Sequence, residues 1–225
     1  MPRRDRERGT FSAPLFSRFL YPRFKQSGLK HGEGEHRQRL LDGIAGEVIE
    51  VGAGDGLNFA YYPQAVTGVL AVEPEDNLRA AASDQANHAP VPVEVKAGLA
   101  DRLPADDNSF DAAVCSLVLC SVDDQAEALA EIRRVLRPGG QLRFYEHVRA
   151  HSRSLAAVQH AVTPVWSRLG GGCHLNRDTE GAITGAGFEI KRIERFVFAP
   201  SPLERLGGDI ILGVGTTREQ SGQLT

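Results

Sequence analysis

The sequence predicts an α/β protein with a doubly wound, mostly parallel sheet and helices on both faces. Apolar runs of strand length alternate with amphipathic runs of helix length along the chain. Residues 110–116 are almost entirely apolar, as strands buried on both faces are. Residues 47–51 run directly into a glycine turn, after which a helix can begin. The 225 residues are enough for one such domain and few for two.

Seven strands and five helices give the arrangement a Rossmann-like outline, which binds ligands at the carboxyl ends of its strands. Pro92 suits an edge position for the third strand. We expect Asp76 or Asn77 to cap the second helix, and Arg137 to Gly140 to end the third and turn the chain. The expected strands are residues 47–51, 69–73, 91–97, 110–116, 141–147, 188–197 and 209–215. The expected helices are residues 35–41, 77–86, 124–136, 154–163 and 178–186.

The segment before the first helix combines a basic arm with an aromatic stretch. Four arginines among the first eight residues indicate a solvated arm, with weak anion binding as the alternative. Residues 11–24 are amphipathic and interrupted by Pro14 and Pro22, and they either cover a pocket or pack as a satellite cluster. We therefore expect an arm and lid over 1–34, a main domain over 35–215 with a substrate-side insert at 150–178, and a polar tail over 216–225.

Composition narrows the classes of partner. A net charge of −3 with 24% charged residues gives no reason to expect nucleic acid or an anionic membrane. No apolar run approaches the roughly 20 residues of a membrane helix, so no membrane anchor is expected. Three cysteines cannot all pair within one chain, which favours reduced thiols in a cytoplasmic protein. The cysteines and histidines show no recognised ligand spacing, so we expect no metal site.

The glycine turn predicts a ligand site of a particular kind. Gly52, Gly54 and Gly56 alternate, whereas dinucleotide loops place their third glycine one position later, and no P-loop lysine follows. Glu50 stands two residues before the first glycine, and a carboxylate there suits a cationic ligand better than a phosphate. Glu73 follows Gly54 by 73 − 54 = 19 residues, close to the spacing of about 20 at which an acid holds ribose hydroxyls.

The ordered motifs resemble those of class I S-adenosylmethionine-dependent methyltransferases. They are residues 50–56, Glu73, Leu103-Pro104, residues 107–111 and the turn at 135–140. Within that superfamily, residues 115–122, 146–148 and 172–177 look most like the methyltransferase-like 7 group, whose better-known members methylate alkyl thiols. Unlike membrane-anchored members of that group, this chain begins with an Arg-rich stretch, so a membrane-dissolved substrate is not expected.

The resemblance implies S-adenosylmethionine as the methyl donor and S-adenosylhomocysteine as the product. Glu50 would face the methionine end, Glu73 would hold the ribose, and Ser116 and Leu117 would line the methyl region. The acid that often binds adenine in this family is replaced by Leu99, which leaves Asp101 as the weaker candidate for the amino group. The implied cofactor-binding residues are Glu50, Gly52, Ala53, Gly54, Gly56, Asn58, Glu73, Pro74, Leu99, Ala100, Asp101, Ser116 and Leu117.

The acceptor side is less constrained. A thiol or hydroxyl acceptor must lose a proton, and His147, just past the fifth strand, is the candidate base, with a structural hydrogen bond as its alternative role. The expected acceptor-side residues are Tyr21, Cys120, His147, Trp166 and His174. A thiol is the first expected acceptor, followed by a phenolic hydroxyl and by lipid or quinone-type carbon. A non-catalytic cofactor-binding protein, a nicotinamide oxidoreductase, and a monomer or a homodimer all stay open.

Overall fold

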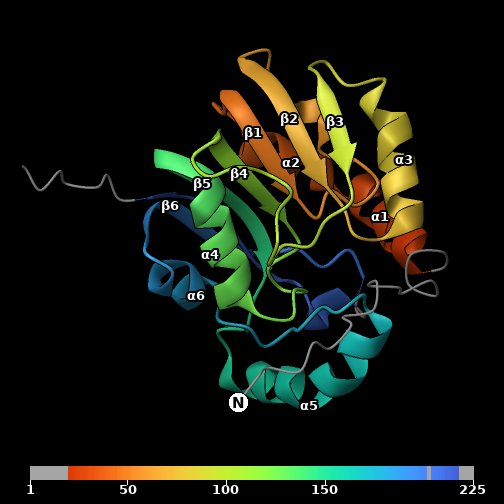
Figure 1. Cartoon of the computed structure of the whole chain (residues 1–225). Helices are drawn as coiled ribbons and strands as arrows, with labels where there is room; N and C mark the ends of the chain where they lie inside the picture. Colours follow the sequence, from red (N-terminus) through yellow and green to blue (C-terminus); the bar gives the residue numbers. More distant parts are fainter. Residues whose placement is uncertain (1–19, 202–203, 218–225) are drawn as a thin grey trace, which may run out of the picture.

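The computed structural model describes residues 20–201 and 204–217. Its centre is a seven-stranded sheet in the order β3-β2-β1-β4-β5-β7-β6 (Figure 1). The strands are β1 (Gly46–Val51), β2 (Val66–Val72), β3 (Val93–Lys96), β4 (Phe110–Ser116), β5 (Leu136–His147), β6 (Phe188–Val197) and β7 (Asp209–Thr217). The predicted fold class is confirmed, and β3 lies at the edge that Pro92 indicated.

The strand order places a ligand site at the middle of the sheet. The chain winds outward from β1 through β2 to β3 and then returns to β4 on the other side of β1, with these strands parallel. Strand β5 continues the parallel part, whereas β7 pairs antiparallel with both β5 and β6. The order therefore reverses between β1 and β4, and ligands of doubly wound sheets bind at the carboxyl ends there.

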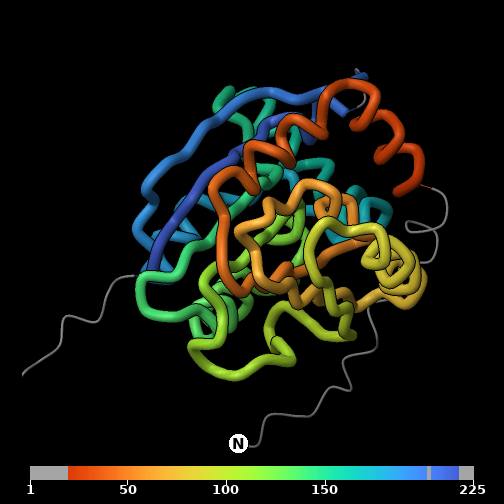
Figure 2. The backbone as a smooth tube through the Cα atoms, turned by 90° about the horizontal axis from the view of Figure 1, so that it is seen from above, coloured from red at the N-terminus to blue at the C-terminus, as the bar shows by residue number. Residues whose placement is uncertain are grey.

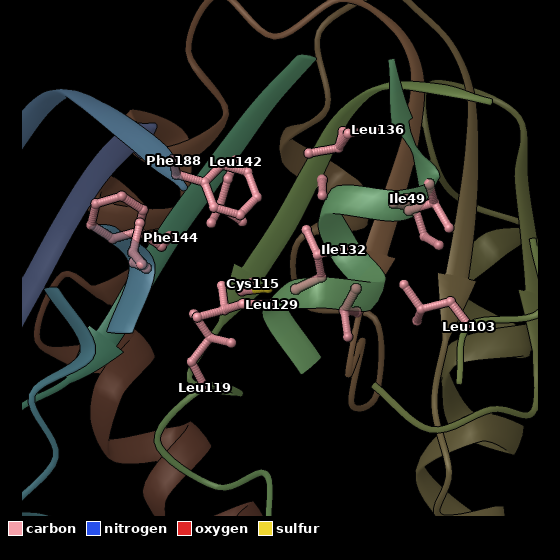
Figure 3. Packing of buried hydrophobic residues seen from close by; sticks show 14 of the residues in the cluster. Ile49, Leu103, Cys115, Leu119, Leu129, Ile132, Leu136, Leu142, Phe144 and Phe188 are labelled. Carbon is pink, nitrogen blue, oxygen red and sulfur yellow. The ribbon is translucent and has the colours of Figure 1, made fainter. Parts of the chain in front are cut away.

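Helices cover both faces of the sheet. The helices are α1 (Tyr21–Lys30), α2 (Glu33–Leu41), α3 (Asp76–Ala86), α4 (Gln125–Val135), α5 (Arg153–Leu169) and α6 (Thr179–Gly185). One core joins α4 and α6 to the sheet, and Figure 3 shows Leu129 and Ile132 of α4 beside Ile49 and Cys115 of the strands. The other core joins α2 and α3 to the opposite face. In Figure 2, α1 and α2 run along the side opposite the connection between β3 and β4.

The starts of three helices differ from the sequence predictions. Pro22 stands in the first turn of α1, where its missing N–H costs nothing, so it begins a helix and does not break one. The stretch expected as a polar link is mostly helical, because α1 continues to Lys30 and α2 begins at Glu33. The cap of α3 is Glu75, whose carboxylate accepts from the Leu78 N–H, and not Asp76 or Asn77. The basic arm and most of the aromatic stretch, residues 1–19, lie outside the described ranges.

Other boundaries moved outward. The helix expected at 154–163 runs from Arg153 to Leu169 and contains Pro164. Strand β5 begins at Leu136, so the expected glycine turn belongs to the start of the strand. Strand β7 continues to Thr217, two residues into the expected tail. In the part of the chain that the structure describes, no helix combines the length and apolar character needed to cross a bilayer.

Candidate functional site

A cavity of about 430 Å³ opens at the carboxyl ends of β1, β2, β4 and β5. Helix α1 contributes Tyr21 and Phe24 to its wall, and α5 contributes Trp166, whose ring centroid lies 6.1 Å from that of Phe24. Figure 1 shows α5 beyond the arrowheads of β1, β2 and β3, apart from the helices that cover the sheet. The cavity therefore lies between the carboxyl ends of the strands on one side and α1 and α5 on the other. These two helices do not belong to the helix layers that cover the faces of the sheet.

The glycine loop forms one wall of this cavity. Gly52 and Gly54 line it. Their φ values are 66° and 60°, which residues other than glycine rarely adopt. A Cβ on Gly52 would lie 2.6 Å from Val118, so the backbone there passes directly against the loop after β4. Gly56 is absent from the cavity lining, and a Cβ there would meet the Phe59 ring at 2.7 Å. Gly56 therefore packs closely against Phe59, and its contact with a cofactor stays a prediction.

Glu50 stands at the base of the loop, 2% exposed. Its two oxygens accept hydrogen bonds from Asn58 Nδ2 at 2.8 Å and from the Tyr62 hydroxyl at 2.7 Å. Burial raises the pKa of Glu50 to about 7, against the lowering effect of these two hydrogen bonds. A cationic group beside this carboxylate would favour its ionised form.

Glu73 connects the loop after β1 to the loop after β2 by two hydrogen bonds. One oxygen accepts from the Gly54 N–H at 2.8 Å and the other from the Glu75 N–H at 2.9 Å. Burial raises its pKa to about 7, although both N–H donors favour the charged form. Each oxygen keeps a further lone pair, so the carboxylate can also accept hydrogen bonds from a ligand in the cavity.

A buried arginine, which the sequence did not single out, joins this wall. Arg37 of α2 donates to Glu33 Oε1 at 2.6 Å, to Asn58 Oδ1 at 2.8 Å and to the Ser116 hydroxyl at 3.3 Å. Its Nε has no hydrogen-bond partner within the described part of the protein. The spacing of four residues between Glu33 and Arg37 could have indicated an ion pair on a helix. The contacts to Asn58 and Ser116 could not be read from the sequence, because these residues are distant along the chain.

The remaining predicted cofactor residues lie around the same space. Pro74, Leu99, Ala100 and Asp101 line the side next to β2 and β3, and Leu117 lines the side next to β4. Leu117 has a φ of 62°, an unusual value for a branched side chain. The cavity lining thus includes twelve of the thirteen predicted cofactor residues: Glu50, Gly52, Ala53, Gly54, Asn58, Glu73, Pro74, Leu99, Ala100, Asp101, Ser116 and Leu117.

The loop after β4 is held by a buried acid. Glu146, fully buried on β5, accepts from the N–H groups of Val118 at 3.0 Å, Leu119 at 2.9 Å and Cys120 at 3.0 Å. Three backbone donors on one carboxylate fix the path of this loop. Cys120 is thereby held against the cavity, where its sulfur lies 3.8 Å from Nδ1 of His147.

His147 meets two thiols. Its Nδ1 also lies 3.6 Å from the sulfur of Cys173, and all three residues line the cavity. Burial lowers the pKa of His147, but the hydrogen bond and charge of Cys120 raise it, with a net rise above the ordinary value. Cys120, His147 and Cys173 bring their ligand atoms within 4.8 Å of one another, although their sequence spacing matches no recognised ligand pattern.

Four of the five residues predicted on the acceptor side line the cavity, and one does not. Tyr21, Cys120, His147 and Trp166 line the cavity, whereas His174 is not among its lining residues. The backbone N–H of His174 donates to the Cys120 carbonyl at 2.8 Å, so this residue supports the loop beside the cavity. Tyr21 donates to Asp55 Oδ1 at 2.7 Å, and Lys25 pairs with the same carboxylate.

We expect the free energy of unfolding of the ligand-free protein to fall as the pH rises from about 5 to about 8. The folded pKa values of Glu50 and Glu73, about 7, exceed their ordinary value of 4.5. Between these values the folded protein holds protons that the unfolded chain has released, so the associated stability is present below 4.5 and lost as the pH passes through about 7. Each carboxyl contributes up to about 3 kcal/mol.

Urea unfolding at a series of pH values measures this fall. The Glu50→Gln variant, which cannot ionise at that position, should show roughly half the change. A free energy of unfolding that stays level or rises over this range would contradict the raised pKa values.

Comparisons with known proteins agree with this geometry. A family model described as a methyltransferase domain matches residues 49–144. Human thiol S-methyltransferase TMT1B is 37% identical over 172 residues, which cover 74% of this chain and 69% of that protein. A demethylmenaquinone methyltransferase of Corynebacterium kroppenstedtii is 36% identical over 110 residues, 48% of this chain and 45% of that one.

A solved structure extends the similarity over most of the chain. The crystal structure of an S-adenosylmethionine-dependent methyltransferase from Thermotoga maritima, described as a possible histamine N-methyltransferase, superposes with a TM-score of 0.68 at 25% identity. The match covers 91% of this chain and 99% of that one. The segment matched by the family model contains Glu50, the glycine loop, Glu73 and Cys120.

Proposed function

The chain belongs to the family of S-adenosylmethionine-dependent methyltransferases that includes the thiol S-methyltransferase TMT1B, and from this premise we propose that it methylates the sulfur of a small-molecule thiol. The choice of a thiol acceptor rests on one observation: at the acceptor end of the cavity, His147 lies beside two buried sulfurs. A demethylmenaquinone methyltransferase matches less than half of the chain, so a quinone-type acceptor has weaker support.

We place S-adenosylmethionine along the glycine loop, because the residues there fit its parts. The open backbone at Gly52 and Gly54 leaves room for a flat ligand. Glu73 meets the ribose hydroxyls, with lone pairs left after its two backbone contacts. Arg37, buried in the wall with an unpartnered Nε, offers a cation for the methionine carboxylate.

The proposed positions of the other groups follow from the same orientation. Glu50 and Asn58 face the cationic methionine end, and Ser116 with Leu117 faces the methyl group. Pro74, Leu99, Ala100 and Asp101 surround the adenine. When bound, S-adenosylmethionine supplies an electrophilic methyl group on a sulfonium that is a good leaving group.

The protein's part in the reaction is alignment, exclusion of water and removal of one proton. Tyr21, Phe24 and Trp166 cover the cavity opposite the sheet and shield the acceptor. His147 takes the proton that the acceptor thiol loses as its sulfur bonds to the methyl carbon. Holding the acceptor sulfur in line with the methyl group would supply most of the rate, because methyl transfer is an in-line displacement at carbon.

The organisation of the whole chain follows as part of this proposal. Residues 35–217 form the methyltransferase domain, residues 1–34 the arm and lid, and residues 150–178 the wall that selects the acceptor, with a polar tail after Thr217. We also propose a cytoplasmic monomer or homodimer without a nucleic-acid partner. Light scattering of the eluting protein during gel filtration measures the oligomeric state.

Two measurements test the function. Isothermal titration should detect binding of S-adenosylmethionine and S-adenosylhomocysteine, and its absence would reject the proposed cofactor site. Mass spectrometry should then detect methylated product from an alkyl thiol in a panel that also holds a phenol and a quinol. Cofactor binding without any product would favour a non-catalytic binding protein, and product from the quinol alone would reject the thiol.

A further inference from the structure

Three residues from distant parts of the chain meet at the acceptor end of the cavity. Cys120 follows β4, His147 ends β5, and Cys173 follows α5. The Nδ1 atom of His147 lies 3.8 Å from the Cys120 sulfur and 3.6 Å from the Cys173 sulfur, and the three ligand atoms all fall within 4.8 Å of one another. Two thiols and one imidazole nitrogen therefore share one small volume.

Hydrogen bonding accounts for only part of this arrangement. An imidazole nitrogen carries either one hydrogen or one lone pair, so Nδ1 can make one well-directed hydrogen bond. Both sulfurs nevertheless lie within contact of that nitrogen. Two thiol donors cannot both use one in-plane lone pair, although the Cys120 sulfur also lies 3.5 Å from the Ser121 hydroxyl oxygen.

A tetrahedral metal centre explains both contacts. Zinc bonds of about 2.3 Å to sulfur and about 2.0–2.1 Å to nitrogen, at tetrahedral angles, place sulfur about 3.6 Å from nitrogen. The observed sulfur–nitrogen separations of 3.8 Å and 3.6 Å are close to this value, and the two sulfurs lie within 4.8 Å of each other. Thiolate and imidazole are also ligands that bind zinc in preference to hard cations, which favour oxygen ligands.

The surroundings hold the ligands in place. Glu146 accepts from the Cys120 N–H at 3.0 Å, and the Cys120 carbonyl accepts from the His174 N–H at 2.8 Å, so both sides of this residue are fixed. Cys120 and Cys173 are 1% and 7% exposed. A side chain that is already oriented by its neighbours loses little entropy when it binds a metal.

We propose that Cys120, His147 and Cys173 bind a Zn²⁺ ion whose fourth position faces the cavity. Binding releases the two thiol protons to solvent, and the His147 ring coordinates through Nδ1 with its hydrogen on Nε2. No electron is transferred. Three protein ligands with one open position are the pattern of catalytic zinc sites and not of closed structural ones.

The open position gives the metal a part in the proposed methyl transfer, and this step alone rests on the proposed function. An acceptor thiol that coordinates there releases its proton to solvent and presents a thiolate, whose lone pair forms the bond to the methyl carbon as the sulfonium–carbon bond breaks. The thioether product is a weaker ligand and leaves. In the metal-bound protein His147 is a ligand, and coordination takes over the removal of the acceptor's proton.

Metal binding can be measured without any activity assay. The full chain, reduced and freed of metal, is dialysed against buffered Zn²⁺ and its metal content measured by plasma mass spectrometry. We expect about one zinc per chain, and thiolate-to-metal absorption when Co²⁺ replaces Zn²⁺. The Cys120→Ser and Cys173→Ser variants should each bind at least about 100-fold more weakly, since each loses one of three ligands.

Matched variants separate this site from the rest of the chain. Cys115→Ala removes a buried thiol of β4 that lies outside the cavity lining and should leave zinc binding unchanged. His147→Cys should retain zinc, because it replaces one ligand by another, whereas His147→Ala should not. Circular dichroism checks that each variant is folded.

The results that overturn the proposal are specific. A reduced wild-type chain that holds no zinc at micromolar free metal would reject it, as would equal binding by the Cys120→Ser/Cys173→Ser double variant. The proposed function is judged separately: zinc binding in a protein that methylates no thiol would leave the metal site standing, and thiol methylation by a metal-free chain would reject the metal's part in the reaction.

Discussion

The Glu73→Ala variant is expected to bind S-adenosylmethionine at least about 100-fold more weakly than the wild type. A carboxylate that accepts hydrogen bonds from both ribose hydroxyls gains roughly 1.5–3 kcal/mol from each, and 1.4 kcal/mol corresponds to a factor of ten. Glu73 is held in place for this contact by the Gly54 and Glu75 N–H groups, at 2.8 Å and 2.9 Å. Isothermal titration measures the loss.

If Glu73 binds the ribose, a second prediction follows for the product S-adenosylhomocysteine. S-adenosylhomocysteine carries the same ribose without the sulfonium charge, so Glu73→Ala should weaken the binding of both ligands by the same factor. Asp76→Ala serves as the matched control, because this exposed carboxylate lies three residues away and pairs with Arg79 outside the cavity lining. A loss below about fivefold in a folded Glu73→Ala protein, or a loss for only one ligand, would contradict ribose binding.

The cofactor half of the site was predictable because it is local in the sequence. The glycine loop and Glu73 lie within one short stretch from β1 through a loop to the end of β2, and fixed spacings in such a stretch reflect the geometry of the fold. The strands were readable for a similar reason, since runs buried on both faces are continuously apolar. Spacing alone did not predict that Gly56 packs against the Phe59 ring and lies outside the cavity lining.

The acceptor half was not predictable because its contacts cross the chain. Cys120 and His147 are 27 residues apart, and His147 and Cys173 are 26 apart. Ligand-spacing rules recognise short loops, so they miss a cluster assembled from two loops and the last residue of β5. Arg37 escaped notice for the same reason, because its partners Asn58 and Ser116 lie on other elements.

Helix α5 shows how tertiary contacts override a local rule. Pro164 removes one helical hydrogen bond, a cost that predicted an end near residue 163. The helix nevertheless continues to Leu169, and on its N-terminal half the buried Gln159 accepts from the Ala150 N–H at 2.8 Å and donates to the Leu206 carbonyl at 2.9 Å. These contacts hold the helix against the loops beside the cavity, so its extension brings Trp166 to the wall.

The Glu146→Ala variant is expected to lower the free energy of unfolding by about 3–6 kcal/mol. It removes the acceptor of three N–H groups in a loop where Leu119 and Cys120 are almost completely buried. Each unpaired buried donor costs about 1–3 kcal/mol, and the total stability of a domain is roughly 5–15 kcal/mol. Urea unfolding measures the change where the variant folds.

Glu146→Gln keeps the prediction testable if the alanine variant does not fold. The glutamine oxygen can accept from the Val118 and Leu119 N–H groups, which share Oε1, but its NH₂ group would face the Cys120 N–H. We therefore expect about 1–3 kcal/mol of destabilisation, the cost of one unpaired donor. Glu194→Ala removes an exposed carboxylate paired with Arg39 and should cost less than about 1 kcal/mol. If Glu146→Gln is as stable as the wild type, then this carboxylate does not hold the loop, and its position must be fixed by other contacts, such as those of Gln125 and Arg177 with the Leu119 carbonyl.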